Sequence, residues 1–330
     1  WRTDVVYQVY IRSFADGNGD GTGDIAGLRS RLGYLRDLGV DAIWLNPWYR
    51  SPLHDGGYDV ADYRDIEPRY GTLDDAETLI ADAHAHGIKV VTDLVPNHTS
   101  SEHAWFQEAI ASPPGSPSRL RYHIRPGRGD GSEPPTDWSS VFGGPAWSRL
   151  DDGEWYLHLF DHTQPDLNWE HPEVVAEFEA IFEFWLDRGV DGFRVDVAHG
   201  LAKDMSFPNV GETGELLGNA KTADHAFWDR DEVHSIIRGW RAVLDAHPGT
   251  MMVAEAWVAP ERLPLYLRPD EYHQSFNFDF LSAEWDAVEM QDVLSRSIDN
   301  AQAVGAAPTW VLSNHDVVRH TTRYGLPKGT

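Results

Sequence analysis

Five segments of the chain carry apolar residues at every third or fourth position, and each is soon followed by a glycine and a short apolar run. This spacing gathers the apolar side chains on one face, so each segment is predicted to be an amphipathic helix. The apolar runs are short and bounded by turn residues, which predicts buried strands. The predicted helices are 24–38, 73–86, 172–188, 232–246 and 284–303. The predicted strands are 40–46, 88–95, 190–195, 251–255 and 309–313, with another at 5–11 and a weaker one near 275–278.

Helices that alternate with strands indicate a parallel sheet covered by helices, and both a doubly wound sheet and a (β/α)8 barrel fit this alternation. Gly87 and Gly189 lie about twice as far apart as Gly39 and Gly87, so extra chain separates the third strand from the third helix. This stretch is rich in proline and glycine but also holds several tryptophans, so we expect a small subdomain and not a linker. The predicted division is a barrel built from 1–97 and 167–330 with an inserted domain at 98–166.

The amino-acid composition and net charge exclude several classes of function. Hydrophobic residues make up 41% and charged residues 24% of the chain, which is typical of a globular protein. The 53 acidic against 27 basic residues give a net charge of −26, so we expect neither nucleic acid nor a membrane as a partner. No apolar run approaches the ~18 residues of a membrane span. The absence of cysteine excludes disulfides and cysteine catalysis, and the lack of a leader pattern predicts a cytoplasmic location.

Polar side chains cluster where four of the predicted strands end. In a parallel barrel those ends surround one mouth, which is where barrel enzymes place their catalytic groups. One charge at a strand end is usually a solvated cap, but four strands that end in this way predict a site. The residues are Asp93, Asn97 and His98, then Arg194 and Asp196, then Glu255, and last Asn314, His315 and Asp316.

Six short motifs resemble those of the α-amylase superfamily, glycoside hydrolase family 13, in their order and spacing. Four are similar to its signature blocks, namely VTDLVPNH at 91–98, GFRVDVAHG at 192–200, VAEAW at 253–257 and SNHD at 313–316. QPDLN at 164–168 is similar to a fifth block. DGNGDGTGD at 16–24 is similar to the metal loop of the α-glucosidase and oligo-1,6-glucosidase branch. The resemblance implies a (β/α)8 TIM barrel in which the insertion after the third strand is the family's domain B.

The resemblance also implies the catalytic residues. Asp196 matches the nucleophile, Glu255 the acid/base and Asp316 the carboxylate that stabilises the transition state. A retaining glycosidase needs two carboxyls about 5–5.5 Å apart, one to attack the anomeric carbon and one to protonate the leaving oxygen. We expect burial and neighbouring carboxylates to raise the pKa of Glu255 so that it holds a proton, and Arg194 to keep Asp196 ionised.

A sugar-binding pocket follows from the same resemblance. Tyr58 is expected to stack on the terminal glucose, and Asp55 to bind its far hydroxyls. His98 and His315 are expected to hydrogen-bond hydroxyls around the scissile bond. The further substrate-binding candidates are Phe142, Phe160 and Gln164 from the insertion, Arg194, and Arg319 as the one basic candidate after Asp316. No role is assigned to His199.

Oxygen-bearing side chains repeat through the motif at 16–24, which suits Ca²⁺. The predicted ligands are Asp16, Asn18, Asp20 and Asp24, with the backbone carbonyl of Thr22 implied by the resemblance. The loop starts like an EF-hand, but its twelfth position is Gly27 in place of a bidentate glutamate. The resemblance implies one structural Ca²⁺, or sometimes Mg²⁺, away from the chemistry, and a metal-free turn is the alternative.

The predicted function is a retaining, exo-acting α-glucosidase that removes terminal non-reducing glucose from short oligosaccharides of the maltose or isomaltose type. Val197, directly after Asp196, is similar to the oligo-1,6-glucosidase pattern, but the AHG that follows departs from it. A preference for α-1,4 or for α-1,6 linkages therefore stays open. A transglycosylase or isomerase of the same family, such as a sucrose isomerase or a trehalose synthase, would use the same carboxylates.

Two other classes of protein compete with this prediction. A catalytically inactive sugar-binding or scaffold relative is disfavoured because all three acids are present. A metal-dependent barrel hydrolase that uses His98, His199 and His315 is disfavoured because no paired histidines lie on one strand and the predicted mouth is rich in carboxylates.

The predicted strands fall one short of the eight that close such a barrel. After Ser313 the sequence holds no apolar run that could form a central strand. Members of the family that this chain resembles continue with an eighth strand and an all-β C-terminal domain. We therefore expect the natural protein to continue beyond Thr330.

Overall fold

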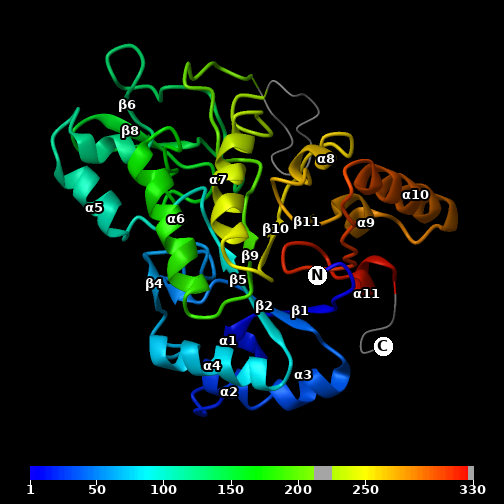
Figure 1. The fold of residues 1–330 in the computed structure, drawn as a ribbon. Coiled ribbons are helices and arrows are strands. Elements are labelled where there is room, and N and C mark those ends of the chain that lie inside the picture. Colours follow the sequence, from blue (N-terminus) through cyan, green and yellow to red (C-terminus); the bar gives the residue numbers. More distant parts are fainter. Residues whose placement is uncertain (212–224, 326–330) are drawn as a thin grey trace.

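A curved parallel sheet forms the centre of the fold, in a computed structural model that describes residues 1–211 and 225–325 (Figure 1). Six strands pair in the order β1-β2-β5-β9-β10-β11, and every neighbouring pair is parallel. All but one of the predicted strands therefore form. Their bounds are Val6–Val9 for β1, Ala42–Leu45 for β2, Lys89–Leu94 for β5, Gly192–Val195 for β9, Met251–Ala254 for β10 and Gln274–Ser275 for β11.

The predicted strand at 309–313 is wrong. Only Thr309 pairs there, through an isolated parallel bridge to Phe276 beyond the end of β11. The residues that follow run as irregular chain beside the open edges of β1 and β11, along a cavity of about 470 Å³. Trp310 is 42% exposed, so this run lacks the burial on both faces that makes a central strand favourable. Within the described residues the sheet therefore does not close into a complete barrel.

Helices cover the outside of the sheet, with α2, α3 and α4 on one side and α6 and α7 beside β9 and β10 (Figure 1). The long helices are α4 at Leu73–Ala85, α6 at Pro172–Leu186, α7 at Val233–Asp245 and α10 at Ala287–Ala303. The short ones are α1 at Ile11–Phe14, α2 at Ile25–Arg29, α3 at Leu32–Leu38, α5 at Ala104–Ala111, η1 at Pro117–Arg121, α8 at Leu263–Tyr266, α9 at Phe278–Ser282 and α11 at His320–Arg323. None of the helices within 1–211 and 225–325 combines the length and the apolar character that crossing a membrane requires.

The segment at 24–38 forms two helices where the periodicity predicts one. Ser30 ends α2, and its hydroxyl donates to the carbonyl of Gly27 at 2.6 Å, which competes with the helical ladder. A capping box starts the next helix, α4. Thr72 accepts from the backbone N–H of Asp75 at 3.2 Å, and the Asp75 carboxylate accepts from the N–H of Thr72 at 2.9 Å.

Large aromatic side chains fill the layer between the sheet and helices α6 and α7. Phe182 of α6 lies 4.5 Å from Phe193 of β9 and 5.5 Å from Trp240 of α7, measured between ring centroids. Trp185 donates from its indole nitrogen to the carbonyl of Tyr63 at 2.8 Å. Burial of such rings stabilises the folded state by about 25 cal/mol per Å² of apolar surface removed from water. This layer therefore stabilises the position of β9 in the sheet.

The stretch 98–166 carries a small sheet of its own between β5 and α6. Its strands β6 (Ile124–Pro126), β7 (Trp147–Arg149) and β8 (Glu154–Leu157) pair antiparallel in the order β6-β8-β7. A second small sheet pairs β3 (Tyr49–Arg50) with β4 (Asp62–Ile66). An isolated bridge between His98 and Asp166 joins the two ends of the stretch, so the chain leaves and rejoins the barrel at one place.

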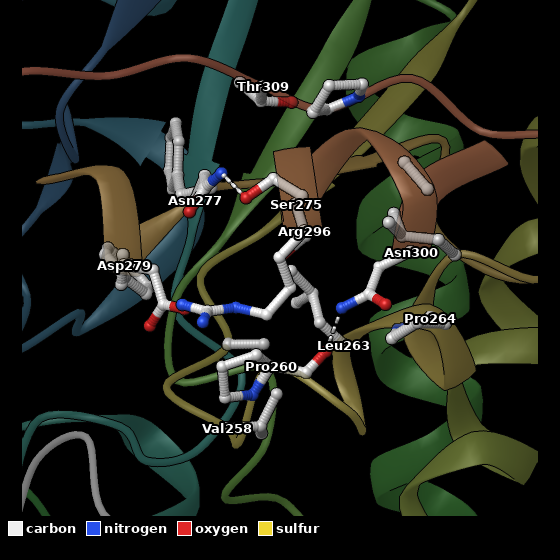
Figure 2. Close-up of a pocket in the computed structure, with 17 residues that line it drawn as sticks. Val258, Pro260, Leu263, Pro264, Ser275, Asn277, Asp279, Arg296, Asn300 and Thr309 are labelled. Carbon is white, nitrogen blue, oxygen red and sulfur yellow. Dashed lines mark hydrogen bonds and ion pairs between the residues drawn. The ribbon is translucent and has the colours of Figure 1, made fainter. Parts of the chain in front are cut away.

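A cavity of about 40 Å³ lies beside β11, between α8, α9 and α10 (Figure 2). Ala256, the residue after Glu255, is part of its wall. Polar contacts hold the surrounding elements, since Arg296 pairs with Asp279 at 2.7 Å and Asn300 donates to the carbonyl of Pro260 at 3.0 Å (Figure 2). The void therefore persists because its walls are fixed by hydrogen bonds while its centre lacks packing.

Filling this cavity should stabilise the fold. Val258 lines the cavity, and Val258→Ile adds one methylene, which we expect to raise the free energy of unfolding by about 0.8 kcal/mol. Urea denaturation measures this change. Val288→Ile is the matched control, because the same methylene is added to a side chain that is 70% exposed and should change stability little. Equal effects of the two substitutions would contradict the prediction.

Candidate active site

Arg194 of β9 is the centre of the site. Its side chain is 1% exposed, and Nη1 donates to Asp93 Oδ1 at 2.9 Å and to the carboxylate of Asp196. Its Nη2 lies 3.1 Å from Oε2 of Glu255. One buried guanidinium therefore contacts carboxyl groups from three neighbouring strands, and three ionised carboxylates around it would leave a net charge of −2.

Strand register brings the two catalytic candidates to the same level of the sheet. Val195 pairs with Leu94 on one side and with Ala254 on the other, so β5, β9 and β10 end together. The ladder continues one residue further, since the N–H of Asp196 donates to the carbonyl of Leu94 at 2.8 Å and that of Glu255 to the carbonyl of Val195 at 2.9 Å. Backbone hydrogen bonds therefore fix both residues on either side of Arg194.

Two N–H donors hold the Glu255 carboxylate. The backbone N–H of Val197 donates to Oε2 at 2.9 Å, and the indole N–H of Trp257 donates to Oε1 at 3.0 Å. Val197 has a φ of 47°, which is a strained conformation for a β-branched residue. The ring of Trp257 is itself stacked on Phe278, with centroids 3.7 Å apart. The carboxylate of Glu255 thus has a fixed orientation before any ligand binds.

The carboxyls around Arg194 titrate together, and the direction differs from the expectation. Burial raises the pKa of Asp196 well above its ordinary value, and it raises the pKa of Asp93 to about 7. Burial also raises the pKa of Glu255, but the charge of Arg194 and the Val197 and Trp257 hydrogen bonds lower this pKa more. The expected rise in the pKa of Glu255 is therefore wrong, and so is the expectation that Arg194 keeps Asp196 ionised in the free protein, because burial outweighs the charge of Arg194 at Asp196. The proton is shared among the carboxyls around Arg194.

The Tyr58 hydroxyl makes three hydrogen bonds beneath the cavity. It donates to Asp93 Oδ2 at 2.9 Å and accepts from the side-chain amide of Asn46 at 2.9 Å. Nε2 of His315 lies 2.8 Å away and, since the hydroxyl has only one hydrogen, is the donor. The Tyr58 and His315 rings stack with centroids 5.4 Å apart and planes 12° apart. The phenol is therefore locked in place by the protein itself.

His315 is held as a neutral ring. Its Nδ1 lies 2.9 Å from the side-chain amide nitrogen of Gln8, which donates to it and also to Asn46 Oδ1 at 2.9 Å. Burial lowers the pKa of His315 to about 3. The edge of this ring also packs against Trp44, whose indole N–H donates to Asp93 at 3.1 Å. Gln8, Trp44 and Asn46 were not predicted, because hydrogen bonds between distant strands leave no periodic signal in the sequence.

His98 and Asp55 form a further part of the cavity wall, with Gln164 directly behind them. The Gln164 side-chain amide donates to Asp55 Oδ2 at 2.8 Å. His98 Nε2 lies 3.2 Å from the carbonyl of Tyr58, while Nδ1 accepts from the side-chain amide of Asn97 at 3.1 Å. Burial lowers the pKa of His98 to about 4 and raises the pKa of Asp55 to about 6. This wall therefore presents a neutral imidazole beside a carboxyl of raised pKa.

Asn97 connects this wall to a buried ion pair. Its Oδ1 accepts from Lys203 Nζ at 2.7 Å, and Lys203 pairs with Asp166 at 2.9 Å. Both charged side chains are fully buried. Buried charges are tolerated only when they are paired and hydrogen-bonded, as these are. Asn97 therefore has a supporting role, and Asp166 of the QPDLN motif anchors the insertion to the barrel.

The remaining site candidates lie at the rim. Phe142 is 58% exposed and packs edge-on against the buried Phe160, with centroids 5.8 Å apart. Burial raises the pKa of Asp316 to about 6, and the charge of Glu255 adds to this effect. Arg319 is exposed at the start of α11 and is not part of the cavity wall, although its charge lowers the pKa of Asp316. Arg319 is thus placed to act on Asp316 only through the field of its charge.

Together these residues bound a cavity of about 400 Å³. The predicted site residues that line it are Asp55, Tyr58, His98, Phe142, Phe160, Asp196, Glu255, His315 and Asp316. Arg194 and Gln164 lie directly behind this wall. Tyr10, Gly56, Val197, His199 and Trp257 also line the cavity and were not predicted as site residues. Trp257 could have been found from its place in the VAEAW motif, whereas Tyr10 offers only its position just after the first strand.

The acidic loop at 16–24 has the donor chemistry for a hard cation. Asp16 accepts from the backbone N–H of Gly19 at 2.6 Å and of Gly21 at 2.8 Å, which curls the loop around this carboxylate. Asp24 is buried and caps α2 by accepting from the N–H of Gly27 at 2.6 Å. All predicted ligands here are oxygens, so the donor set fits Ca²⁺. Among the described side chains, the only group of three acidic or histidine residues whose ligand atoms lie within 4.8 Å of one another is Glu183, Asp187 and His247. The carboxylates of the loop at 16–24 do not meet this limit, so a bound ion would have to draw them together.

Comparison with known proteins points to one family. The family model for the alpha amylase catalytic domain matches residues 8–328. An α-glucosidase of Culex pipiens is 38% identical over 98% of this chain and 58% of its own length. An oligo-1,6-glucosidase of Parageobacillus thermoglucosidasius is 40% identical over 98% of this chain and 59% of its own length. The crystal structure of an α-glucosyl transfer enzyme is similar with a TM-score of 0.89 at 36% identity, over 100% of this chain and 63% of that one.

These matches confirm the predicted class of fold. The similarity covers nearly the whole chain, so the curved six-stranded sheet is the described part of a (β/α)8 barrel. The chain spans about three fifths of the length of these relatives.

The raised pKa values of Asp55 and Asp316 give a direct test of the site. Carboxyl ¹³C NMR should show both side chains titrating near pH 6, because burial disfavours their ionised forms. Asp316→Asn should remove one titration and lower the pKa of Asp55, because the negative charge of Asp316 makes ionisation of Asp55 harder. Asp65→Asn, an exposed acid paired with Arg50, is the control and should shift neither. Titration of both groups near pH 4 would contradict this description of the cavity.

Proposed function

This chain belongs to the alpha-amylase family, and we propose that it carries the active site of a retaining, exo-acting α-glucosidase that removes terminal α-linked glucose from short oligosaccharides. The observation that carries the proposal is the pair of carboxyls, Asp196 and Glu255, that end neighbouring strands at the wall of one cavity. Arg194 contacts both. The relatives named α-glucosidase and oligo-1,6-glucosidase support the choice of reaction and substrate class.

In the first step, Asp196 attacks the anomeric carbon of the bound glucose. The bond from this carbon to the leaving oxygen breaks as Glu255 transfers a proton to that oxygen, which leaves a glucosyl ester on Asp196. The proton that burial holds among the coupled carboxyls must therefore lie on Glu255 when the bond breaks. Arg194 keeps a positive charge beside both groups throughout, which stabilises the nucleophile in its ionised form.

In the second step, water takes the place of the leaving group. Glu255, now ionised, accepts a proton from the water as its oxygen attacks the anomeric carbon and the ester bond to Asp196 breaks. Two displacements at the same carbon retain its configuration. Asp316, which also lines the cavity, is proposed to hydrogen-bond sugar hydroxyls as positive charge develops on the ring.

The part of the cavity wall that holds Asp55, Tyr58 and His98 is proposed to select a terminal glucose. Tyr58 offers a ring face for stacking, and Asp55 with its raised pKa offers a carboxyl to the far hydroxyls. His98 and His315 offer neutral imidazoles, which can both donate and accept hydrogen bonds. A pocket closed behind the terminal unit favours removal of single residues from a chain end.

A transglycosylase or an isomerase is the second candidate function. The specific observation is the similarity to an α-glucosyl transfer enzyme over the whole of this chain. Both reactions share the first step and differ in whether water or a sugar hydroxyl attacks the ester. Product analysis on maltose, isomaltose, sucrose and trehalose separates them, because hydrolysis releases free glucose while transfer yields longer or rearranged saccharides.

We also propose that the loop at 16–24 holds one structural Ca²⁺. Asp16, Asn18, Asp20 and Asp24, with the carbonyl of Thr22, would supply the ligands. The loop links α1 to α2 and lies outside the residues that line the catalytic cavity. The ion would neutralise clustered carboxylates and stabilise the folded state, with no part in the reaction.

Two expectations from composition stay predictions. The cytoplasmic location is tested by cell fractionation. The absence of a nucleic-acid partner, expected from the net charge of −26, is tested by a mobility-shift assay with DNA and RNA.

Substitution of the nucleophile tests the proposed reaction. Asp196→Asn should lower kcat on a nitrophenyl α-glucoside by about 10⁴-fold or more while the protein stays folded, because a catalytic group is lost with little change in packing. Asp245→Asn, an exposed acid paired with Arg241 on α7, is the control and should stay within about two-fold. A mechanism-based fluoroglucoside should form an ester on Asp196. A label on another residue would refute the assignment.

Removal of metal tests the Ca²⁺ proposal. A chelator should lower Tm by roughly 3–8 °C, and added Ca²⁺ should restore it, because an ion that binds only the folded state stabilises that state. Asp20→Asn should weaken this response, whereas Asp37→Asn, a surface acid paired with Arg36, should keep it. Loss of activity on chelation at temperatures where the fold persists would contradict a purely structural ion.

A further inference from the structure

A second cavity, of about 570 Å³, lies outside the catalytic one. Its wall is formed by His123 just before β6, by 168–170 ahead of α6, by 201–206 after β9 and by the start of α7. The two cavities have no lining residue in common. The volume lies within the range of about 300–1,000 Å³ that is typical of small-molecule sites.

His123 places an unused acceptor in this wall. The residue is 3% exposed, and its Nε2 has no hydrogen-bond partner among the described residues. Burial and the charges of Lys203 and Arg125 lower the pKa of the ring well below its ordinary value, so the ring is neutral near pH 7. A ring nitrogen bonds the carbonyl of Leu167. Since Nε2 has no partner, this donor is Nδ1, and Nε2 is the acceptor of the ring.

Arg230 supplies the complementary donor. Its Nε is buried and has no hydrogen-bond partner among the described residues. The other nitrogens of the guanidinium face acids, since Nη2 lies 2.9 Å from Glu232 and Nη1 3.7 Å from Asp204. A guanidinium nitrogen can only donate. The wall therefore holds one unpartnered acceptor and one unpartnered donor, and hydroxyl groups, which both donate and accept, can satisfy each of them.

The charges of the wall favour a neutral ligand. Lys203 lines the cavity, but its ammonium group is already paired with Asp166 and hydrogen-bonded to Asn97. An anion would meet an excess of acids and the lone pair of His123 Nε2, whereas a cation would leave Nε of Arg230 without a partner. The other charged side chains of the wall are Arg230, Glu170, Asp204 and Glu232.

Apolar side chains complete the wall. Trp169, Leu201 and Ile236 lie among its polar residues. Trp169 is fixed there, because its indole N–H donates to the carbonyl of Pro96 at 2.8 Å. Small-molecule sites combine such apolar surface with a few placed polar groups. A saccharide has the matching character, since its C–H faces can pack on apolar side chains while its hydroxyls bind the polar ones.

We propose that this cavity is an accessory binding site for a neutral polyhydroxylated ligand of mono- or disaccharide size, whose hydroxyls donate to His123 and accept from Arg230. The site goes beyond the proposed reaction and does not depend on it. A bound ligand would connect the insertion with α7, because His123 belongs to the insertion and Arg230 lies just before the helix.

Side-chain ¹⁵N NMR of the histidines in the full-length protein tests the proposal. The probe is cellobiose, a disaccharide whose β-linkage the proposed reaction does not cleave. Cellobiose should shift the Nε2 signal of His123 in a saturable way, because this nitrogen gains a hydrogen bond. Sodium phosphate at the same concentration should leave the signal in place. His123→Gln identifies the signal by removing it.

Two pairs of variants locate the binding. Ser235→Trp fills the cavity from an exposed position on α7 and should abolish the shift, whereas Ser295→Trp, exposed on α10 and outside the cavity, should keep it. Arg230→Lys keeps a positive charge but removes the Nε donor, so the Kd for cellobiose should rise about 10-fold or more. Arg241→Lys, at a side chain paired with Asp245 outside the cavity, should leave the Kd unchanged.

The outcomes separate this proposal from the glucosidase reaction. No saturable shift with cellobiose, or a shift that persists in Ser235→Trp, would overturn the accessory site. A shift with phosphate but not with cellobiose would overturn its neutral ligand. The NMR measurement needs no turnover. A protein that binds cellobiose at His123 but does not cleave a nitrophenyl α-glucoside would therefore overturn the glucosidase proposal alone.

Discussion

A single buried guanidinium, that of Arg194, is the constraint on which the site depends. Removing three carboxyls from water is costly unless a positive charge and hydrogen bonds replace the lost solvent. Arg194 supplies that charge at 1% exposure and reaches Asp93, Asp196 and Glu255 from one position. The three carboxyls and Arg194 therefore titrate as one cluster, so replacing any one of them changes the pKa values of the others.

The parallel sheet makes this cluster possible. Because Val195 pairs with both Leu94 and Ala254, three strands end at one level and deliver their next side chains to one point. The aromatic layer of Phe182, Phe193 and Trp240 holds the middle strand against α6 and α7. The hydrophobic packing between the helices and the outer face of the sheet thus fixes the positions of the charged groups at the ends of the strands.

The sequence predicted the elements whose signals are local and missed the features that depend on distant partners. Helices with caps and strands bounded by glycine were found, and the motifs located Asp196, Glu255 and most of the cavity wall. The break at Ser30 depends on a side-chain hydrogen bond, and the failure of 309–313 to pair depends on the burial available beside an open edge. Gln8, Trp44 and Asn46 joined the site through contacts that no spacing encodes. The direction of the Glu255 pKa could not be predicted either, because it depends on the charge of Arg194 and on two N–H donors that only the folded chain positions beside this carboxylate.

The two ends of the cavity differ in how far the protein satisfies its own polar groups. At the end proposed to bind glucose, Tyr58 and His315 already have full sets of hydrogen-bond partners, so their positions are set before any ligand binds. Such a pre-organised wall pays little entropy on binding and discriminates strongly against a wrong sugar. On the Glu255 side the wall is formed by Val197, His199 and Trp257. Val197 and Trp257 donate to the Glu255 carboxylate, whereas Nδ1 of His199 has no hydrogen-bond partner among the described residues. Because the Glu255 carboxylate is fixed as firmly as Tyr58 and His315, the proposed hydrolysis and glucosyl transfer would use one rigid set of carboxyls and differ only in the molecule that attacks the ester.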